Sequence, residues 1–243
     1  MSRTEAETAS RTRDVLLAAV AHELRGPLTV ILGWTRMLRH GDSADIDRGL
    51  ELIERAATNQ HLLIEELLDV SRIATQLVEA RSVIDVNDVV QDVVDGAKPA
   101  ARDRDVEITS NLSLRPVLVL GDALRLQQIV GNLVANAIKF TPEGGRVTIT
   151  LGHVGLDAQI EVADTGIGID RAILSRIFEP FFQTDAYPSR SSAGLGLGLA
   201  IVRQLVELHG GTIEAQSEGP GRGTRMVVTI PVAPAGALES TTR

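Results

Sequence analysis

The stretch that decides the fold of this 243-residue chain is Asn132-Leu-Val-Ala-Asn136-Ala-Ile-Lys139-Phe140-Thr141. Asn132, Asn136 and Lys139 stand at positions i, i+4 and i+7, so a helix would place all three on one face. Two amides and an ammonium on an otherwise apolar segment are costly to bury unless polar ligands meet them. The stretch therefore predicts a helix whose polar face either meets solvent or lines a binding site.

A second stretch, Asp164-Thr-Gly166-Ile-Gly168, follows an apolar run that predicts a strand. A carboxylate at the end of a strand can accept a hydrogen bond from an exocyclic amine such as that of adenine. The two glycines allow a sharp turn and a close approach of the backbone to a flat base. Taken alone, this spacing is more often only a turn.

A third stretch, Gly194-Leu-Gly196-Leu-Gly198-Leu199, opens a predicted helix. Glycines at a helix start let backbone N–H groups face phosphate oxygens, and the helix dipole favours that negative charge. A flexible hinge is the alternative for this stretch alone. The three stretches in this order predict a nucleotide site, in which an amide oxygen could ligate Mg²⁺ and Lys139 could neutralise phosphate charge.

Upstream of these stretches, apolar residues recur at helical spacing over residues 14–40 and 46–80, with a turn at 41–45 between them. Two long amphipathic helices joined by a short turn predict an antiparallel hairpin. Such a hairpin cannot bury a wide apolar stripe alone. The simplest partner is a second copy, which would give a four-helix bundle.

Beyond residue 83 the pattern alternates between strands and helices, which predicts a sheet with helices on one face. Asp122 is expected to cap the helix that carries the first stretch. We expect helices at 87–104, 122–139, 171–176 and 197–209, and strands at 106–112, 117–120, 146–152, 158–163, 212–217 and 224–230. The predicted domains are a linker or helix start at 1–13, a helical domain at 14–80, an α/β domain at 83–231 and a disordered tail at 232–243.

Composition narrows the function classes. The net charge of −8 argues against nucleic acid as a partner, because phosphate contacts need clustered Lys and Arg. The absence of Cys excludes disulfides and Cys-based metal sites. No apolar run reaches the roughly 18 residues of a membrane span, and no signal peptide is recognisable. We expect a cytoplasmic chain without a membrane segment, or the soluble part of a larger or membrane-anchored protein.

The chain resembles the bacterial two-component sensor histidine kinases over about residues 14–231. The family's N box resembles residues 132–141, its G1 box 164–168, its F box Phe178-Glu179-Pro180-Phe181 and its G2 box 194–199. Its H box resembles His22-Glu23-Leu24-Arg25 followed by Pro27-Leu28. The resemblance implies a dimerisation and phosphoacceptor (HisKA) hairpin followed by an α/β sandwich of the GHKL, or Bergerat, type that is shared with the gyrase and heat-shock-90 ATPases.

The resemblance also implies roles for single residues. Asn136 would hold Mg²⁺, Asn132 and Lys139 would lie near the phosphates, Asp164 would bind the adenine amine, and Thr224 would assist at the adenine. Residues 181–193 would form a mobile lid over ATP, and a P-loop motif is absent from the sequence. The full expected ATP-binding set is Asn132, Asn136, Lys139, Phe140, Asp164, Gly166, Gly168, Gly194, Gly196, Gly198, Leu199 and Thr224.

His22 is the expected phosphoacceptor. A neutral imidazole is a competent nucleophile near pH 7, since its reference pKa is about 6.5. Glu23 could act as general base by accepting the proton of the other ring nitrogen. Pro27 removes a helix N–H and is expected to loosen the helix beyond the histidine. The alternative is a surface histidine on a kinked helix. We expect His40, His61, His153 and His209 to be structural.

The expected activity is ATP-dependent autophosphorylation of His22, followed by transfer to an aspartate of a response-regulator receiver domain, in a homodimer. Family members often carry Thr or Asn at position 26, a residue tied to dephosphorylation of the partner, whereas this chain has Gly26. Phosphatase activity is therefore expected to be weak or absent. The rival hypotheses are an ATPase clamp or chaperone, an ATP-binding dimeric scaffold and a phosphotransfer module without an ATP site. The input signal, the cognate regulator and cis or trans phosphorylation are not readable from the sequence.

Overall fold

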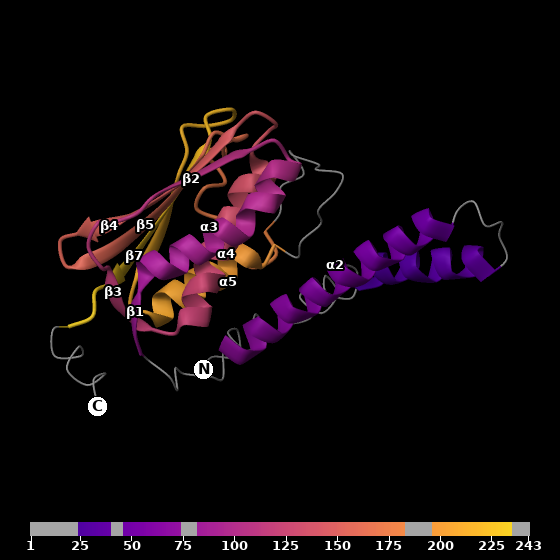
Figure 1. Cartoon of the computed structure of the whole chain (residues 1–243), viewed down its shortest axis with the longest axis horizontal. Helices are drawn as coiled ribbons and strands as arrows, with labels where there is room; N and C mark the ends of the chain where they lie inside the picture. The colour runs from indigo at the N-terminus through magenta and orange to yellow at the C-terminus, as the bar shows by residue number, and fades with distance from the viewer. Residues whose placement is uncertain (1–23, 40–45, 74–81, 183–195, 235–243) are drawn as a thin grey trace, which may run out of the picture. The chain divides into compact units, whose positions relative to one another are not determined.

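The computed structural model describes residues 24–39, 46–73, 82–182 and 196–234 (Figure 1). The chain divides into two compact units, residues 1–72 with 180–198 and residues 73–179 with 199–243. The first is helical over residues 24–39 and in α2 (Ile46–Ile73), and the second is an α/β unit. No helix within the described ranges is long and apolar enough to cross a membrane.

The two helices of the first unit pack closely around a glycine. A Cβ on the buried Gly49 of α2 would lie 2.9 Å from Cε3 of Trp34 and 3.0 Å from Cδ2 of Leu38. Contact between the end of one helix and the start of the next is the register of an antiparallel hairpin, as expected from the sequence. Apolar side chains remain exposed on both helices in the single chain, namely Leu28, Val30, Leu32, Met37, Ile46, Leu50 and Ile64.

The second unit is built on a five-stranded sheet in the order β2-β4-β5-β7-β6. Its strands are β2 (Glu107–Asn111), β4 (Arg146–Val154), β5 (Asp157–Asp164), β6 (Thr212–Gln216) and β7 (Thr224–Pro231). β2 runs parallel to β4, and the remaining neighbours are antiparallel. Side chains on β4, β5 and β7 alternate between buried and more exposed positions, so one face of the sheet carries the core.

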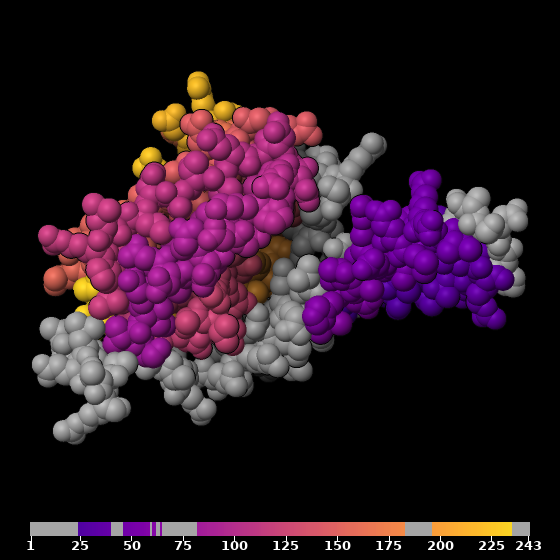
Figure 2. All heavy atoms as spheres, in the orientation of Figure 1, coloured from indigo at the N-terminus to yellow at the C-terminus, as the bar shows by residue number. Residues whose placement is uncertain are grey.

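Three helices cover that face of the sheet: α3 (Val86–Asp103), α4 (Ala123–Phe140) and α5 (Gly198–Leu208) (Figure 1). Side chains of α3 form much of the helical face seen in the space-filling view (Figure 2). The core between the layers is aliphatic. Its largest fully buried side chains are Leu126, Ile129, Leu133, Ile149, Ile160, Ile201, Leu205, Ile230, Val86 and Val90.

Asp122 caps α4 as expected, because its Oδ1 accepts hydrogen bonds from the backbone N–H groups of Leu124 (2.9 Å) and Arg125 (3.4 Å). His209, just after α5, meets the same helix start. Its Nδ1–H donates to the Leu205 carbonyl (2.7 Å) and its Nε2 accepts from the backbone N–H of Asp122 (3.4 Å). The histidine therefore joins the end of α5 to the start of α4, which agrees with its expected structural role.

The sequence did not reveal one short strand. β1 (Ser82–Asp85) pairs antiparallel with β3 (Leu118–Gly121) as a separate two-stranded sheet. Asp85 ends this strand and also caps α3, accepting from the backbone N–H groups of Asn87 and Val117. Beyond β7, the backbone N–H of Ala233 donates to the Leu118 carbonyl, and Val232 forms a bridge with Val119.

The helix expected at 171–176 is wrong, because these residues form turns. The backbone N–H groups of Ile173, Arg176 and Glu179 each bond to the carbonyl three residues earlier. Only every third N–H takes part, so the bonds do not accumulate into a helix. The Asp170 carboxylate also accepts the N–H of Ala172, a local contact of the kind that caps α4, but no α-helix follows it here.

We predict that Gly121→Ala lowers the free energy of unfolding by about 1–3 kcal/mol, because a Cβ here overpacks the core. It would lie 2.6 Å from Cδ2 of His209 and would displace the ring from Asp122 and Leu205. Gly96→Ala is the control. Gly96 lies inside α3, and an added Cβ there would have no atom within 4 Å. The free energy of unfolding of Gly96→Ala should therefore rise by about 0.5–1 kcal/mol.

Denaturant unfolding of both variants checks this prediction. Equal stabilities for the two variants would contradict the packing described at His209.

Candidate functional site

The end of β5 places the Asp164 carboxylate beside the start of β7. In the β5–β7 register Asp164 is paired with Thr224. Its Oδ1 accepts hydrogen bonds from the backbone N–H groups of Gly166 (2.8 Å) and Thr224 (3.1 Å). Its Oδ2 accepts no hydrogen bond from the described residues.

Burial raises the pKa of the Asp164 carboxyl above its usual value of 3.8. The backbone N–H groups of Gly166 and Thr224 act in the opposite direction, because they stabilise the carboxylate. The result is an acceptor that is partly removed from water and fixed in direction by two backbone donors. Such a carboxylate suits recognition of a neutral amine donor.

Glycine is required at three positions around this carboxylate because backbone atoms fill the space of a side chain. A Cβ on Gly166 would lie 2.5 Å from the Phe140 carbonyl oxygen and 2.7 Å from Oδ1 of Asp164. A Cβ on Gly223 would overlap the Asp164 carbonyl oxygen. Gly168 has φ +68°, and a Cβ there would overlap the carbonyl oxygen of Gly219.

Two turns, residues 164–169 and 217–223, are joined by backbone hydrogen bonds. Gly223 N–H donates to the Gly166 carbonyl (3.1 Å), and Gly221 N–H donates to the Ile167 carbonyl (2.6 Å). Ile167 N–H in turn donates to the carbonyl of Phe140, the last residue of α4 (3.1 Å). The two turns and the end of α4 therefore form one connected wall around Asp164.

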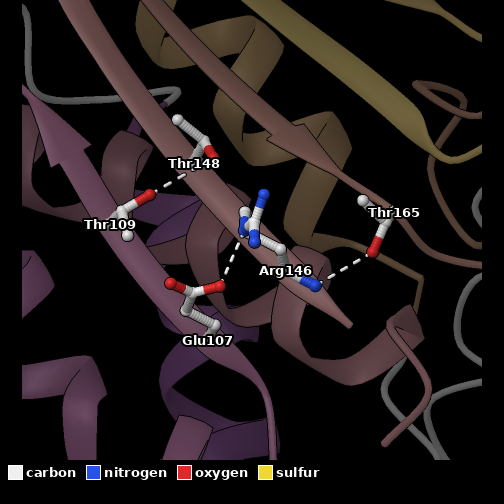
Figure 3. A network of polar contacts seen from close by, with 5 residues as sticks. All are labelled: Glu107, Thr109, Arg146, Thr148 and Thr165. Atoms are coloured by element: carbon white, nitrogen blue, oxygen red, sulfur yellow. Dashed lines mark hydrogen bonds and ion pairs between the residues drawn. The ribbon is translucent and has the colours of Figure 1, made fainter. Parts of the chain in front are cut away.

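Thr165 attaches the first turn to the sheet (Figure 3). Its Oγ1 accepts from the Arg146 backbone N–H (2.9 Å), and its own N–H donates to the Arg146 carbonyl (3.0 Å). The Arg146 side chain pairs with Glu107 at 2.7 Å, and both side chains are more than half exposed. That ion pair adds little stability, so the two hydrogen bonds between Thr165 and the Arg146 backbone fix the turn.

The polar face of α4 carries three of the predicted residues. Asn132, Asn136 and Lys139 are all half-buried, whereas the sequence left open a solvated face or a face that lines a binding site. Lys139 Nζ lies 5.2 Å from the centroid of the Phe140 ring, within the range of a cation–π contact. The α4 end is secured by Arg104, which donates to the Lys139 carbonyl (3.0 Å), and by Thr141, which donates to the Ala137 carbonyl (2.7 Å).

The third predicted stretch is described from Gly196 onward. Gly196 has φ +69°, its carbonyl accepts from Phe181 N–H (3.0 Å), and a Cβ there would lie 2.8 Å from the Phe182 carbonyl oxygen. Phe181 itself has φ +64°, an uncommon backbone for a bulky residue. α5 begins at Gly198, and Leu199 in its first turn is half-buried.

Several predicted residues lie outside the described ranges. These are His22, Glu23 and Gly194, together with His40, residues 74–81 and most of the stretch expected to form a lid. Gly26 and Pro27 lie in the helical segment 24–39, and a Cβ on Gly26 would meet no atom within 4 Å. In the part of the chain that is described, no group of three His, Cys, Asp or Glu side chains could hold a metal.

The structure also brings in a group that sequence reasoning missed. The Ser217 hydroxyl contacts the turns around Asp164 and has no local sequence signal. Phe140, one of the expected residues, contacts the first turn through its backbone carbonyl. The run Gly219-Pro-Gly-Arg-Gly223 indicates a loop, but only the fold shows that this loop meets the turn after β5.

Two family models match the chain. Residues 12–76 match the "His Kinase A (phospho-acceptor) domain", and residues 121–234 match the "Histidine kinase-, DNA gyrase B-, and HSP90-like ATPase". The signal transduction histidine-protein kinase BarA of Escherichia coli K12 is 38% identical over 232 residues, which cover 92% of this chain and 25% of BarA. The chain thus spans about a quarter of the length of this relative.

Solved structures agree with these matches. The mycobacterial sensor histidine kinase MprB has a TM-score of 0.56 at 32% identity, with coverage of 63% of this chain and 99% of that structure. Full-length ShkA in complex with AMPPNP has a TM-score of 0.68 at 32% identity and coverage of 90% and 46%. The histidine kinase ThkA in complex with the response regulator TrrA has a TM-score of 0.73 at 26% identity and coverage of 96% and 66%.

We predict that Asp164→Asn keeps the fold and changes the pH dependence of stability. An Asn Oδ1 can still accept the Gly166 and Thr224 N–H groups, and it carries no charge to desolvate. Since the pKa of Asp164 is raised in the folded state, the folded protein holds its proton more tightly than the unfolded chain. Wild-type stability relative to the variant should therefore fall as the pH rises from 3.8 through the folded-state pKa.

Chemical denaturation across a pH series measures this difference, with Asp157→Asn at the other end of β5 as control. A difference between wild type and Asp164→Asn that grows in favour of wild type with rising pH would contradict the raised pKa.

Proposed function

We propose a protein histidine kinase activity for this chain, which belongs to the sensor histidine kinase family. It binds ATP in the α/β unit, phosphorylates itself on His22 and passes the phosphoryl group to an aspartate of a response-regulator receiver domain. The observation that carries the proposal is the half-buried Asp164 carboxylate, held on Oδ1 by two backbone donors and without a hydrogen bond on Oδ2 from the described residues. The helix α4, which carries two amides and an ammonium, ends at the turn that follows this carboxylate.

The adenine amine is the donor proposed for Oδ2 of Asp164. Gly166, Gly168 and Gly223 support this assignment, because the absence of their side chains lets the turns beside the carboxylate pack directly against each other and against the end of α4, which fixes the backbone around Asp164. Thr224 contributes its backbone N–H to Asp164 and stands next to the same surface. The AMPPNP in the ShkA structure supports an adenine nucleotide as the ligand class.

The phosphates are assigned to the polar face of α4 and to the glycine-rich start of α5. Lys139 supplies positive charge, and Gly196 and Gly198 supply backbone N–H groups at a helix N-terminus. Asn136 fits Mg²⁺, because its amide oxygen is a hard donor and the ion takes much of its remaining shell from phosphates and water. When bound, Mg²⁺ neutralises charge that develops on the phosphate oxygens.

The chemical step is an in-line displacement at the γ-phosphorus. A ring nitrogen of neutral His22 donates its lone pair to phosphorus, and the bond to the β–γ bridging oxygen breaks, which releases ADP. The proton on the other ring nitrogen passes to Glu23, which leaves phosphohistidine. The rate enhancement comes mainly from positioning and charge neutralisation, because the neutral imidazole needs no activation beyond this proton transfer near pH 7.

The proposed partners are a second copy and a receiver domain. The exposed apolar side chains of the hairpin, such as Leu28, Leu32 and Leu50, support a helical dimer. The receiver is expected to dock on both helices near His22, and the ThkA–TrrA complex supports a partner of this kind. We assign the dimerisation and phosphotransfer domain to residues 14–80 and the catalytic domain to 83–231.

Incubation with γ-labelled ATP and Mg²⁺ tests the proposed function directly. Wild type should acquire a label that is labile in acid and stable in base, as expected of phosphohistidine. His22→Ala should reduce the label to background, whereas His153→Ala, an exposed residue near the β4–β5 turn, should leave it unchanged. A label that survives His22→Ala, or that is lost in base rather than acid, would contradict the assignment.

We further predict that the protein accelerates loss of phosphate from its phosphorylated receiver weakly or not at all, because Gly26 has no side chain to orient a water molecule. The helix has room for a side chain at position 26, since an added Cβ would meet nothing within 4 Å. Gly26→Thr should therefore gain phosphatase activity while keeping its kinase activity. Rapid dephosphorylation of the receiver that depends on the wild-type protein would contradict this prediction.

A further inference from the structure

Ser217, immediately after β6, has a hydroxyl that bonds to both turns around Asp164. Its Oγ accepts from the backbone N–H of Ile169 (3.0 Å) and from that of Gly219 (3.3 Å). It lies within donor distance of two carbonyl oxygens, that of Gly223 at 2.8 Å and that of Gly219 at 3.4 Å. The shorter distance makes Gly223 the better acceptor.

The hydroxyl reaches Asp164 through Gly223. Gly223 is in contact with the Asp164 backbone, and its N–H is bonded to the Gly166 carbonyl. The next residue, Thr224, provides one of the two N–H groups on the Asp164 carboxylate. Ser217 therefore joins the two turns through Ile169 and Gly223. The Asp164 carboxylate joins them a second time through Gly166 and Thr224.

We propose that Ser217 is a positioning residue for recognition of the nucleotide base. It contacts no part of the proposed ligand itself. By fixing Gly223 and Ile169, it holds the Thr224 N–H in place and thereby sets the direction of the Asp164 carboxylate. The inference rests on the proposed function, because it assigns base selectivity to the same site.

Removal of the hydroxyl would leave the Ile169 N–H and the Gly223 carbonyl without this partner, which favours separation of the two turns. The carboxylate would then lose its fixed direction and with it part of its preference for an amine donor. Discrimination between ATP and inosine triphosphate measures that preference, because inosine carries a carbonyl oxygen where adenine carries the amine.

The first measurement uses the nucleotide-free full chain. In Ser217→Ala, amide hydrogen exchange at Gly166, Ile169 and Thr224 should accelerate about tenfold or more, which corresponds to about 1.4 kcal/mol. Ser217→Thr keeps the hydroxyl and should restore slow exchange. Ser113→Ala is the matched control, because the Ser113 hydroxyl caps the N–H of Arg115 two residues on, in a loop away from these turns.

The second measurement is the affinity for ATP and for inosine triphosphate with Mg²⁺. Ser217→Ala should bind ATP about tenfold more weakly, with a smaller ratio between the two nucleotides, and Ser217→Thr should recover both values. Autophosphorylation should show a raised KM for ATP with kcat nearly unchanged. Ser113→Ala should match wild type in all of these quantities.

The outcomes separate the two proposals. Wild type that binds no ATP would overturn the proposed function and, with it, a role for Ser217 in base selection. Wild type that binds ATP, with a Ser217→Ala variant that keeps the same nucleotide ratio and the same amide exchange, would overturn the inference alone. An equal loss of affinity for both nucleotides would reduce Ser217 to a structural role and would likewise overturn it.

Discussion

The arrangement depends on one oxygen atom that accepts two backbone hydrogen bonds. Oδ1 of Asp164 holds the Gly166 N–H of its own turn and the Thr224 N–H at the start of the neighbouring strand. This bond pair fixes a partly buried carboxylate whose burial alone would favour the protonated form. The glycines around it are also obligatory, because backbone atoms of the facing turn or of the end of α4 lie where their side chains would be.

The same constraint explains why distant segments of the chain are needed. The end of α4 contributes the Phe140 carbonyl to the first turn, and the loop after β6 contributes Ser217, Gly221 and Gly223. The sheet order places β7 between β5 and β6, so both turns emerge at the same edge. The amides and the ammonium of α4 lie on the helix that ends at this edge. The two turns around Asp164 are thus held rigid mainly by backbone contacts rather than by ion pairs.

Local signals in the sequence were sufficient for most elements. The helices α3 and α4 were predictable from apolar periodicity, and Asp122 was predictable as a cap because capping acts within three residues. β1 was not predictable, because its four residues form a strand only by pairing with β3, which lies more than thirty positions later in the sequence. The helix expected at 171–176 shows the opposite error, since its apolar spacing fits a helix while its backbone forms separate turns. Ser217 escaped notice because its partner Ile169 is 48 positions away.

The central claim is that the Asp164 carboxylate and the two backbone donors on it form the base-recognition site. Titration of the ¹⁵N-labelled full chain with ADP and Mg²⁺, followed by NMR, tests this claim directly. The account predicts that the amide resonances of Gly166 and Thr224 shift among the most strongly in the chain, and that Asp164→Asn abolishes these shifts at the same nucleotide concentration. Saturable ADP binding that leaves both amide resonances unmoved would contradict it.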